Sequence, residues 1–355
     1  MKLLSIVILN WNGAGFLKQF LQTLINHSQL PGVEVVVADN ASTDASLTYL
    51  AEKFSDIRVI KLNKNYGFAG GYNRALEQID SKYYLLLNSD IEVPEGWLKP
   101  LVSFMEKYPE VAACGPKILD YNKPTHFEYA GASGGFIDRY GYPFCRGRIF
   151  DALEEDTGQH DHSVDVFWAS GAALLVRSEA YWNAGGLDED FFAHMEEIDL
   201  CWRLKNRGHR IAVVPASCVY HVGGGSLPRG NPFKTYLNFR NNLFLMYKNL
   251  PNKGFRVKIF VRLILDGISS LRFLLGGDLK DFGAVLRAHL AFYKGKRRYK
   301  PFRKENKTYH NYVTYNEIYP GSVVLDFFLL RNRQIDRLRK DFSRNMCEAE
   351  VSQTT

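Results

Sequence analysis

The sequence contains few cysteines, and none of them forms a pattern typical of disulfide frameworks or zinc cages. Five cysteines occur among 355 residues, an odd number with no Cys-x-x-Cys pair. Disulfide-stapled folds and zinc cages depend on such pairs, so the sequence argues against both. We therefore expect a reducing, cytoplasmic location.

The sequence also lacks an uninterrupted apolar run long enough to span a bilayer as one helix. The N-terminal run Leu3–Leu9 is short, and polar Asn10 and Asn12 follow it without a small-residue cleavage site. We interpret this run as a buried strand rather than as a signal peptide. No internal repeat and no low-complexity tract is present.

Two nucleotide-binding motifs are missing after this first strand. No Gly-x-Gly-x-x-Gly follows it, which argues against a dinucleotide oxidoreductase. A nucleotidyltransferase normally needs a basic, glycine-rich loop early in the chain, and residues 10–15 contain no basic residue.

The net charge of +7 would suit a nucleic-acid binder. However, the basic residues concentrate late and no known nucleic-acid motif appears, so we expect no nucleic-acid partner.

What is present is a globular composition with alternating strand and helix patterns. Apolar residues make up 46% of the chain and charged residues 23%, so it can bury a core. We expect strands at 3–9, 33–38, 58–62 and 83–88 and helices near 16–25, 45–54 and 73–79, the last opened by a glycine-containing loop at 63–72. This order predicts an α/β fold with a mainly parallel, twisted sheet flanked by helices.

Polar residues follow four of the predicted strands directly. Open α/β sheets bind ligands at the carboxyl ends of their strands, which lie along one edge. Four polar strand ends therefore predict a polar ligand along that edge. The residues concerned are Asn10 and Asn12, Asp39, Asn65, and Asn88 with Asp90.

The later sequence is less regular and then becomes basic. We expect strands at 111–118, 171–176 and 210–214, helices at 177–183 and 196–206, and loops with short strands over 127–165. Beyond Pro232, helical patterns cover 236–247, 255–275 and 331–344. In the second of these, Lys258, Arg262 and Asp266 form one polar stripe beside a broad apolar face.

Three candidate site residues each have a structural alternative. Asp39 could accept a hydrogen bond from a nucleobase or ribose, or could stabilise the turn that it begins. Asp90 could bind a divalent cation that bridges two phosphates, or could belong to a simple turn. His221 precedes a glycine run and could bind a metal or a phosphate, or could be a structural histidine.

Carboxylates crowd the start of the predicted helix at 196–206. Glu196, Glu197 and Asp199 would be stabilised there by the helix dipole alone. The preceding Phe191, Phe192 and Met195 bring apolar surface to them, and desolvation raises the pKa of a carboxyl group toward that of a catalytic base. Asp199 and Arg203 are four residues apart and could form an ion pair along the helix.

Taken together, these motifs resemble family 2 glycosyltransferases with the A-type fold, particularly the rhamnosyltransferase-like bacterial branch. The resemblance covers roughly residues 3–225 and depends on the combination and order of the motifs. The matching segments are 5–13, 37–44, 65–73, 86–90, 196–203 and 220–225.

The resemblance implies roles for individual residues. Asp39 matches the base-contacting aspartate, and Asn88-Ser89-Asp90 matches the D-x-D motif with Asn88 in place of the first aspartate. Asp90 is then the direct metal ligand, with His221 completing the site. Glu197 matches the catalytic base, where relatives often carry aspartate, and Glu196 is the alternative base. The donor-binding residues implied are Leu9, Asn10, Trp11, Asn12, Asp39, Asn65, Gly67, Asn73, Asn88, Ser89 and Asp90.

The resemblance further implies an inverting enzyme that uses Mg²⁺ or Mn²⁺. It would transfer rhamnose or another hexose from a nucleoside-diphosphate sugar to a hydroxyl of a glycan or lipid-linked acceptor in cell-surface polysaccharide synthesis. A nucleotidyltransferase-like protein and a non-catalytic nucleotide-sugar-binding protein remain the alternatives.

We expect a catalytic domain over residues 1–230 and a mostly helical, basic extension over 231–355. The extension could contact an anionic membrane surface, which would make the protein peripheral on the inner face of the cell membrane. It could instead pack on the catalytic domain or form a homodimer contact.

Overall fold

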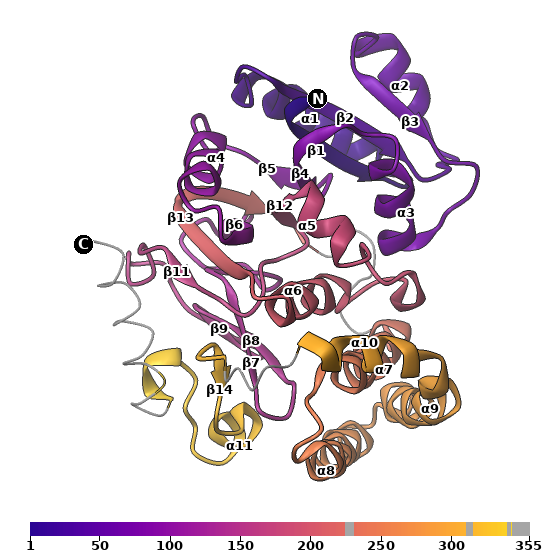
Figure 1. Cartoon of the computed structure of the whole chain (residues 1–355), viewed down its shortest axis with the longest axis vertical. Helices are drawn as coiled ribbons and strands as arrows, with labels where there is room; N and C mark the ends of the chain where they lie inside the picture. The colour runs from indigo at the N-terminus through magenta and orange to yellow at the C-terminus, as the bar shows by residue number, and fades with distance from the viewer. Residues whose placement is uncertain (224–230, 310–314, 339–341, 343–355) are drawn as a thin grey trace.

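The computed structural model describes residues 1–223, 231–309, 315–338 and 342. Its first part alternates strands and helices, as the sequence predicts (Figure 1). The elements in chain order are β1 (Lys2–Asn10), α1 (Ala14–His27), β2 (Val33–Asp39), α2 (Ser46–Lys53), β3 (Arg58–Lys61), α3 (Gly67–Leu76) and β4 (Ser81–Leu87).

The predicted position of the third helix is wrong. The chain turns into α3 at Gly67, six residues earlier than expected, so the glycine-rich stretch is helical rather than a loop. Glycine is needed here for close packing: a Cβ on Gly71 would lie 2.8 Å from the Leu9 side chain. Glycines were interpreted as loop residues, but here they let the helix approach the sheet.

The remaining strands of the main sheet come from the middle of the chain. They are β5 (Ile91–Glu92), β6 (Val111–Asp120), β11 (Val164–Asp165), β12 (Ala173–Arg177) and β13 (Arg210–His221). The described residues form a sheet in the order β11-β13-β6-β12-β4-β1-β2-β3, with β5 paired to β13. Strands β1 to β4 are parallel, whereas β12 runs antiparallel to both β4 and β6. The α/β fold is confirmed, and its sheet is mixed beyond β4.

Helices cover both faces of this sheet. Apolar side chains of α1, α2 and α4 (Leu98–Lys107) form one core with one face. Those of α3, α5 (Ser178–Asn183) and α6 (Glu196–Asn206) form a second core with the other face. Because β1 and β4 are buried on both sides, their ends are held rigidly at one edge of the sheet.

The irregular stretch predicted over 127–165 contains a second, smaller sheet. Its strands are β7 (Gly135–Asp138), β8 (Pro143–Cys145), β9 (Arg148–Ile149), β10 (Ala152–Leu153) and β14 (Ile318–Tyr319). Strand β14 pairs with β7 in parallel, so residues from the end of the chain complete a sheet begun much earlier.

The late part of the chain is mostly helical, as predicted. Its helices are α7 (Pro232–Asn249), α8 (Phe255–Leu275), α9 (Leu279–Gly295), α10 (Lys300–Tyr309) and α11 (Val323–Phe328). The helix predicted over 331–344 is wrong for residues 331–338, which contain only the 3₁₀ turn Ile335–Arg337; of the rest only Phe342 is described. No helix among the described residues is both long and apolar enough to cross a bilayer.

Candidate active site

The parallel register brings the polar strand ends together. Asn10 and Asp39 are paired neighbours at the ends of β1 and β2. The Nδ2 atom of Asn10 donates to Oδ1 of Asp39 over 3.1 Å, and both side chains are buried. Two of the predicted donor-binding residues therefore form one hydrogen-bonded unit at the sheet edge.

The turn after β2 depends on this unit. Oδ2 of Asp39 accepts a hydrogen bond from the backbone N–H of Ser42, and Oδ1 of Asn12 accepts one from the N–H of Thr43. Asp39 thus has the turn-stabilising role that was its alternative, and its carboxylate keeps lone pairs for a further donor. Trp11, beside this turn, keeps 51% of its surface exposed.

Several of the other predicted donor-binding residues hold backbone in place. Oδ1 of Asn65 accepts from the N–H of Gly67, where φ is +72°, and the Leu9 side chain packs on α3. The Asn73 amide bonds both the N–H and the carbonyl of Leu187. These contacts position the loops around the site, while direct donor contacts by these residues remain predictions.

Asp90 and His221 meet at the end of the main sheet. Strand β13 pairs with β5 so that His221 faces Ile91, and Nε2 of His221 lies 3.2 Å from Oδ1 of Asp90. The Asn88 amide nitrogen is 3.4 Å from the same ring atom, and Ser89, between Asn88 and Asp90 in the sequence, is half-buried. The structure therefore brings together the residues that the sequence proposed for the metal.

A residue that the sequence analysis missed completes this group. Oε2 of Glu128 lies 3.3 Å from Nδ1 of His221, on the opposite side of the ring from Asp90. Burial by itself would lower the pKa of His221, but the two carboxylates outweigh it and raise this pKa to about 10. Glu128 lies in an irregular stretch without periodicity or motif, so no signal in the sequence could have identified it.

The donor set suits a divalent cation in part. A carboxylate oxygen and an imidazole nitrogen are suitable ligands, and a carboxylate on the other ring nitrogen is the usual partner of a metal-bound histidine. Among the described residues, no group of three or more His, Cys, Asp or Glu side chains is arranged to hold a metal ion. Asp90 and His221 would therefore need oxygens from a bound diphosphate or water to complete the coordination.

The two candidate bases lie at the start of α6. Burial and the neighbouring charge of Glu197 raise the pKa of Glu196 well above its usual value, and burial raises the pKa of Glu197 to about 7. Each has one buried carboxylate oxygen without a hydrogen-bond partner. Glu196 is buried, whereas Glu197 is partly exposed and next to Gly171. Glu197 is therefore the more accessible of two carboxyl groups that both retain protons readily.

The backbone before α6 adopts an unusual conformation. Phe192, His194 and Met195 all have positive φ values, between 65° and 74°, which is costly for residues other than glycine. The side-chain amide of Asn241 on α7 donates to the carbonyls of Phe191, Ala193 and His194. Helix α7 therefore fixes the segment that leads into the candidate bases.

A buried ionic cluster joins α6 to α7. The predicted pair of Asp199 and Arg203 is confirmed, with 2.8 Å between Oδ2 and Nε. Lys248 lies 2.7 Å from the same oxygen, and Asn249 donates to the other one. Burial would raise the pKa of Asp199, but Lys248 and Arg203 lower it. The sequence analysis missed both α7 residues.

Comparison with known proteins relates this chain to glycosyltransferases. Residues 5–166 match the model of Glycosyl transferase family 2. The N-acetylglucosaminyl-diphospho-decaprenol L-rhamnosyltransferase of Mycobacterium tuberculosis is 27% identical over 61% of this chain and 75% of its own length. Rhamnosyltransferase WbbL of Escherichia coli K12 is 25% identical over 61% of this chain and 82% of its own.

A third relative and two solved structures extend the comparison. The low-salt glycan biosynthesis hexosyltransferase Agl10 of Haloferax volcanii is 25% identical over 71% of this chain and 77% of its own. GalNAc-T7 with UDP, GalNAc and Mn²⁺ superposes with a TM-score of 0.55 at 14% identity, over 69% of this chain and 48% of that one. The mannosyltransferase PcManGT of Pyrobaculum calidifontis, with GDP-Man and Mn²⁺, gives 0.50 at 15% identity, over 86% and 84%.

At these identities the solved structures establish the fold alone. The family match goes further, because residues 5–166 include Asn10, Asp39, Asp90 and Glu128. Residues 5–166 therefore match glycosyl transferase family 2, and the chain is a glycosyltransferase similar to these two rhamnosyltransferases.

Proposed function

We propose that this glycosyltransferase is an inverting, metal-dependent enzyme that uses a nucleoside-diphosphate sugar. The observation that carries the proposal is that two functional groups lie near one strand end. Asp90 contacts His221 there, and Glu197 lies next to Gly171, whose neighbour Ala172 accepts a hydrogen bond from the N–H of Asn88. The first group suits a diphosphate with its cation, and the second suits proton removal from an acceptor.

The residues of the sheet edge would hold the donor. Asp39 has lone pairs for a ribose or nucleobase, and exposed Trp11 offers an aromatic surface beside it. Asp90 and His221 would hold Mg²⁺ or Mn²⁺, which would neutralise the charge that develops on the departing diphosphate. The structurally similar GalNAc-T7 and PcManGT carry Mn²⁺ with their nucleotides, which supports this assignment.

Glu197 would act as the base. Its pKa of about 7 lets it be ionised at neutral pH and still accept a proton. The acceptor hydroxyl would lose its proton to Glu197 while its oxygen attacks the anomeric carbon. The nucleoside diphosphate would leave from the opposite face, which inverts the anomeric configuration. Glu196 is the alternative base, but its burial leaves it less accessible to an acceptor.

The names of the relatives suggest which sugar is transferred and which acceptor receives it. Two are rhamnosyltransferases and one is a hexosyltransferase of glycan synthesis, and the mycobacterial protein is named for a diphospho-decaprenol substrate. We propose rhamnose or another hexose as the sugar, and a glycan or lipid-linked hydroxyl in cell-surface polysaccharide synthesis as the acceptor.

We further propose a cytoplasmic protein that is peripheral on the inner face of the membrane. The boundary near residue 230 and a homodimer remain predictions.

A thermal-shift panel of nucleotide sugars tests the donor proposal. One donor should raise the melting temperature in the presence of Mn²⁺ or Mg²⁺, and EDTA should remove the effect. Analysis of the product anomer by NMR then tests inversion. Specific donor binding without any transfer would favour the non-catalytic alternative, and stabilisation by nucleoside triphosphates alone would favour a nucleotidyltransferase.

A further inference from the structure

Helix α8 is amphipathic, but its polar side faces the protein and its apolar side faces outward. Its polar stripe faces inward: Arg262 and Asp266 are only 3% and 0% exposed, and Tyr142 donates to Asp266 over 2.8 Å. Its outward face is apolar, with large side chains spaced three or four residues apart. These are Val257, Phe260, Ile264, Ile268, Leu271 and Leu275. The sequence analysis identified the stripe but could not say which face was buried.

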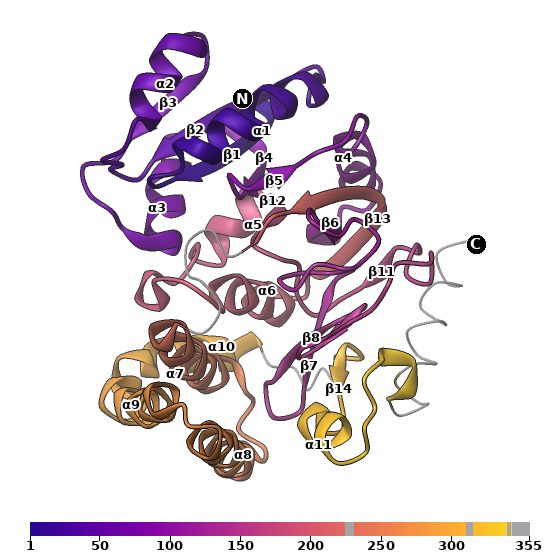
Figure 2. The same cartoon turned by 180° about the vertical axis from the view of Figure 1, so that it is seen from behind.

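The exposed apolar surface continues onto neighbouring helices. Figures 1 and 2 both place α8, α9 and α11 at the end of the molecule opposite α2. The guanidinium of Arg272 on α8 lies 4.8 Å from the ring centre of Phe328, which joins α8 to α11. The further exposed apolar residues are Leu279, Leu286, Leu290 and Tyr293 on α9, and Leu325 and Leu329 at α11. Large apolar side chains exposed on three neighbouring helices indicate an interaction site.

The charges around this surface are mostly positive. Of the acidic residues on α8 and α9 and at their ends, Asp266 and Asp281 are buried, and exposed Asp278 caps α9. Exposed cations at the same end include Lys253, Arg256, Arg272, Lys280, Arg287 and Lys294. A second copy of this chain would present the same cations and be repelled, whereas an anionic lipid surface is complementary.

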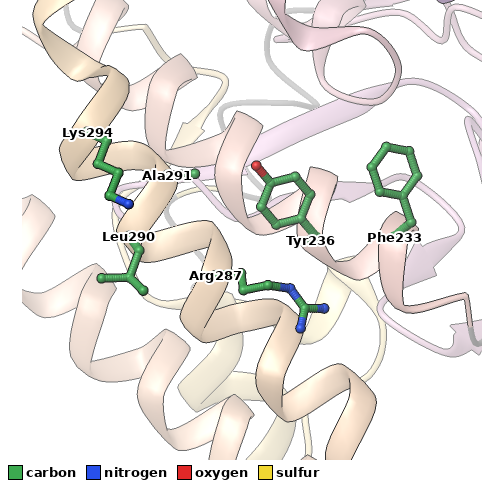
Figure 3. A pocket seen from close by; sticks show the side chains of 6 residues that line it. All are labelled: Phe233, Tyr236, Arg287, Leu290, Ala291 and Lys294. Atoms are coloured by element: carbon green, nitrogen blue, oxygen red, sulfur yellow. The ribbon is translucent and has the colours of Figure 1, made fainter.

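A groove between α7 and α9 opens beside this apolar surface. It has a volume of about 430 Å³, and Leu290 belongs to both. Figure 3 shows the side chains that line this groove, with Arg287 and Lys294 two turns apart on α9 and the aromatic rings of Tyr236 and Phe233 on α7. In the described part of the chain, neither cation has a carboxylate within salt-bridge distance. The groove therefore offers two cations and an apolar wall.

The groove is connected to the candidate base. The rings of Phe233 and Phe192 lie 6.4 Å apart, and Phe192 is four residues before Glu196. Phe192 also packs against Gly67, the first residue of α3. A ligand in the groove would thus lie next to the segment that leads into the catalytic glutamates.

We propose that this groove binds the phosphate groups of a lipid-linked acceptor, with Arg287 and Lys294 as the contacts. The lipid chain would lie along the apolar face of α8 and α9, at the surface of an anionic membrane. Phe233 and Phe192 would form the wall along which the acceptor's sugar reaches Glu197. This inference rests on the proposed function in one respect, that the acceptor is lipid-linked.

Binding of farnesyl diphosphate to the full chain tests the proposal. EDTA in the buffer prevents metal-dependent binding at the donor site. Removing two charged contacts in the double variant Arg287→Ala/Lys294→Ala should weaken binding at least about tenfold. Arg256→Ala/Lys280→Ala removes two exposed cations from the same end of the molecule but outside the groove, and should change binding less than about twofold.

The outcomes separate specific binding from general charge attraction. Equal losses in both double variants, or no binding by the natural chain, would overturn the proposal. Inorganic diphosphate that binds as tightly as farnesyl diphosphate would also overturn it, because the lipid chain would then contribute nothing. The nucleotide-sugar thermal shift is measured on the same variants. A donor shift without groove-dependent binding refutes this inference alone, whereas loss of any donor shift in the natural chain refutes the proposed function.

Discussion

The Nδ1 atom of His221 lies 3.3 Å from Glu128, while its Nε2 atom lies 3.2 Å from Asp90. The ring is therefore fixed on both sides, and its orientation toward Asp90 depends on a residue outside every recognised motif. Glu128 is therefore a positioning residue: it contacts His221 and would influence a bound cation through that ring. This arrangement can be tested without measuring activity.

Glu128→Gln should weaken the binding of Mn²⁺ about 10- to 100-fold, because it removes the charge that orients the histidine. Isothermal titration with Mn²⁺ and a nucleoside diphosphate measures this directly. Glu154→Gln is a matched control, since Glu154 also lies beside a buried histidine, His160, at 3.6 Å. If both variants bound Mn²⁺ as the natural protein does, Glu128 would have no role in the metal site.

Glu197→Gln should reduce transfer about 100- to 10,000-fold, which is the usual contribution of a general base, and should leave donor binding intact. Glu196→Gln should have a smaller effect, because Glu196 is buried. Initial rates and the donor thermal shift are measured on both variants. A larger loss of transfer in Glu196→Gln would exchange the two assignments.

Transfer should depend on pH through Glu197. A base must be ionised to accept a proton, so kcat/KM should rise with pH and reach half its maximum near pH 7. The folded protein also holds this proton more tightly than the unfolded chain does. Stability should therefore fall as pH rises from about 4.5 to above 7. Urea unfolding of Glu197→Gln should show a shallower decline, and an unchanged decline would contradict the raised pKa.

Asn241→Ala should destabilise the protein by about 1–3 kcal/mol, because it removes donors from buried carbonyls. The segment from Phe191 to His194 would lose its support, so transfer should fall more than stability alone explains. Urea unfolding and initial rates test the two effects. Gln22→Ala, at an exposed position of α1, is the control for loss of a side-chain amide. A stable variant with normal transfer would show that α7 does not hold this segment.

Ile264→Asp/Ile268→Asp should abolish co-sedimentation with anionic vesicles, because two charges would enter the apolar face of α8. Both side chains are exposed, so the fold should persist. Thr48→Asp/Ala51→Asp on α2 adds the same charge at the opposite end of the molecule and should bind vesicles normally. Equal recovery of all three proteins with vesicles would exclude α8 from membrane contact.

Much of the fold could be predicted, because burial on both faces gives continuous apolar strands and their polar ends follow at once. The helices 196–206 and 255–275 were predicted with the bounds that the structure gives them. The position of α3 was not predicted correctly, because a glycine that permits a loop also permits close helix packing. Neither Gly67 nor Gly71 carries a local signal that separates these two uses.

The site was only partly predictable. Asp39, Asp90 and His221 lie at strand ends and could be identified from pattern and resemblance. Glu128, Asn241 and Lys248 act through contacts with residues 47 to 93 positions away, and nothing near them in the sequence indicates those partners. The inward polar stripe of α8 was visible, but which face of the helix met the protein depended on Tyr142 and Asn242 from other elements.

The pairing of β14 with β7 has a consequence for biosynthesis. Residues 135–138 leave the ribosome well before 318–319, and pairing across such a separation must close a long loop. During translation, the smaller sheet therefore waits for its last strand, while the main sheet is complete once His221 has emerged. The nascent chain should accordingly gain protease resistance in two stages, the second only after residue 319 has been released from the exit tunnel.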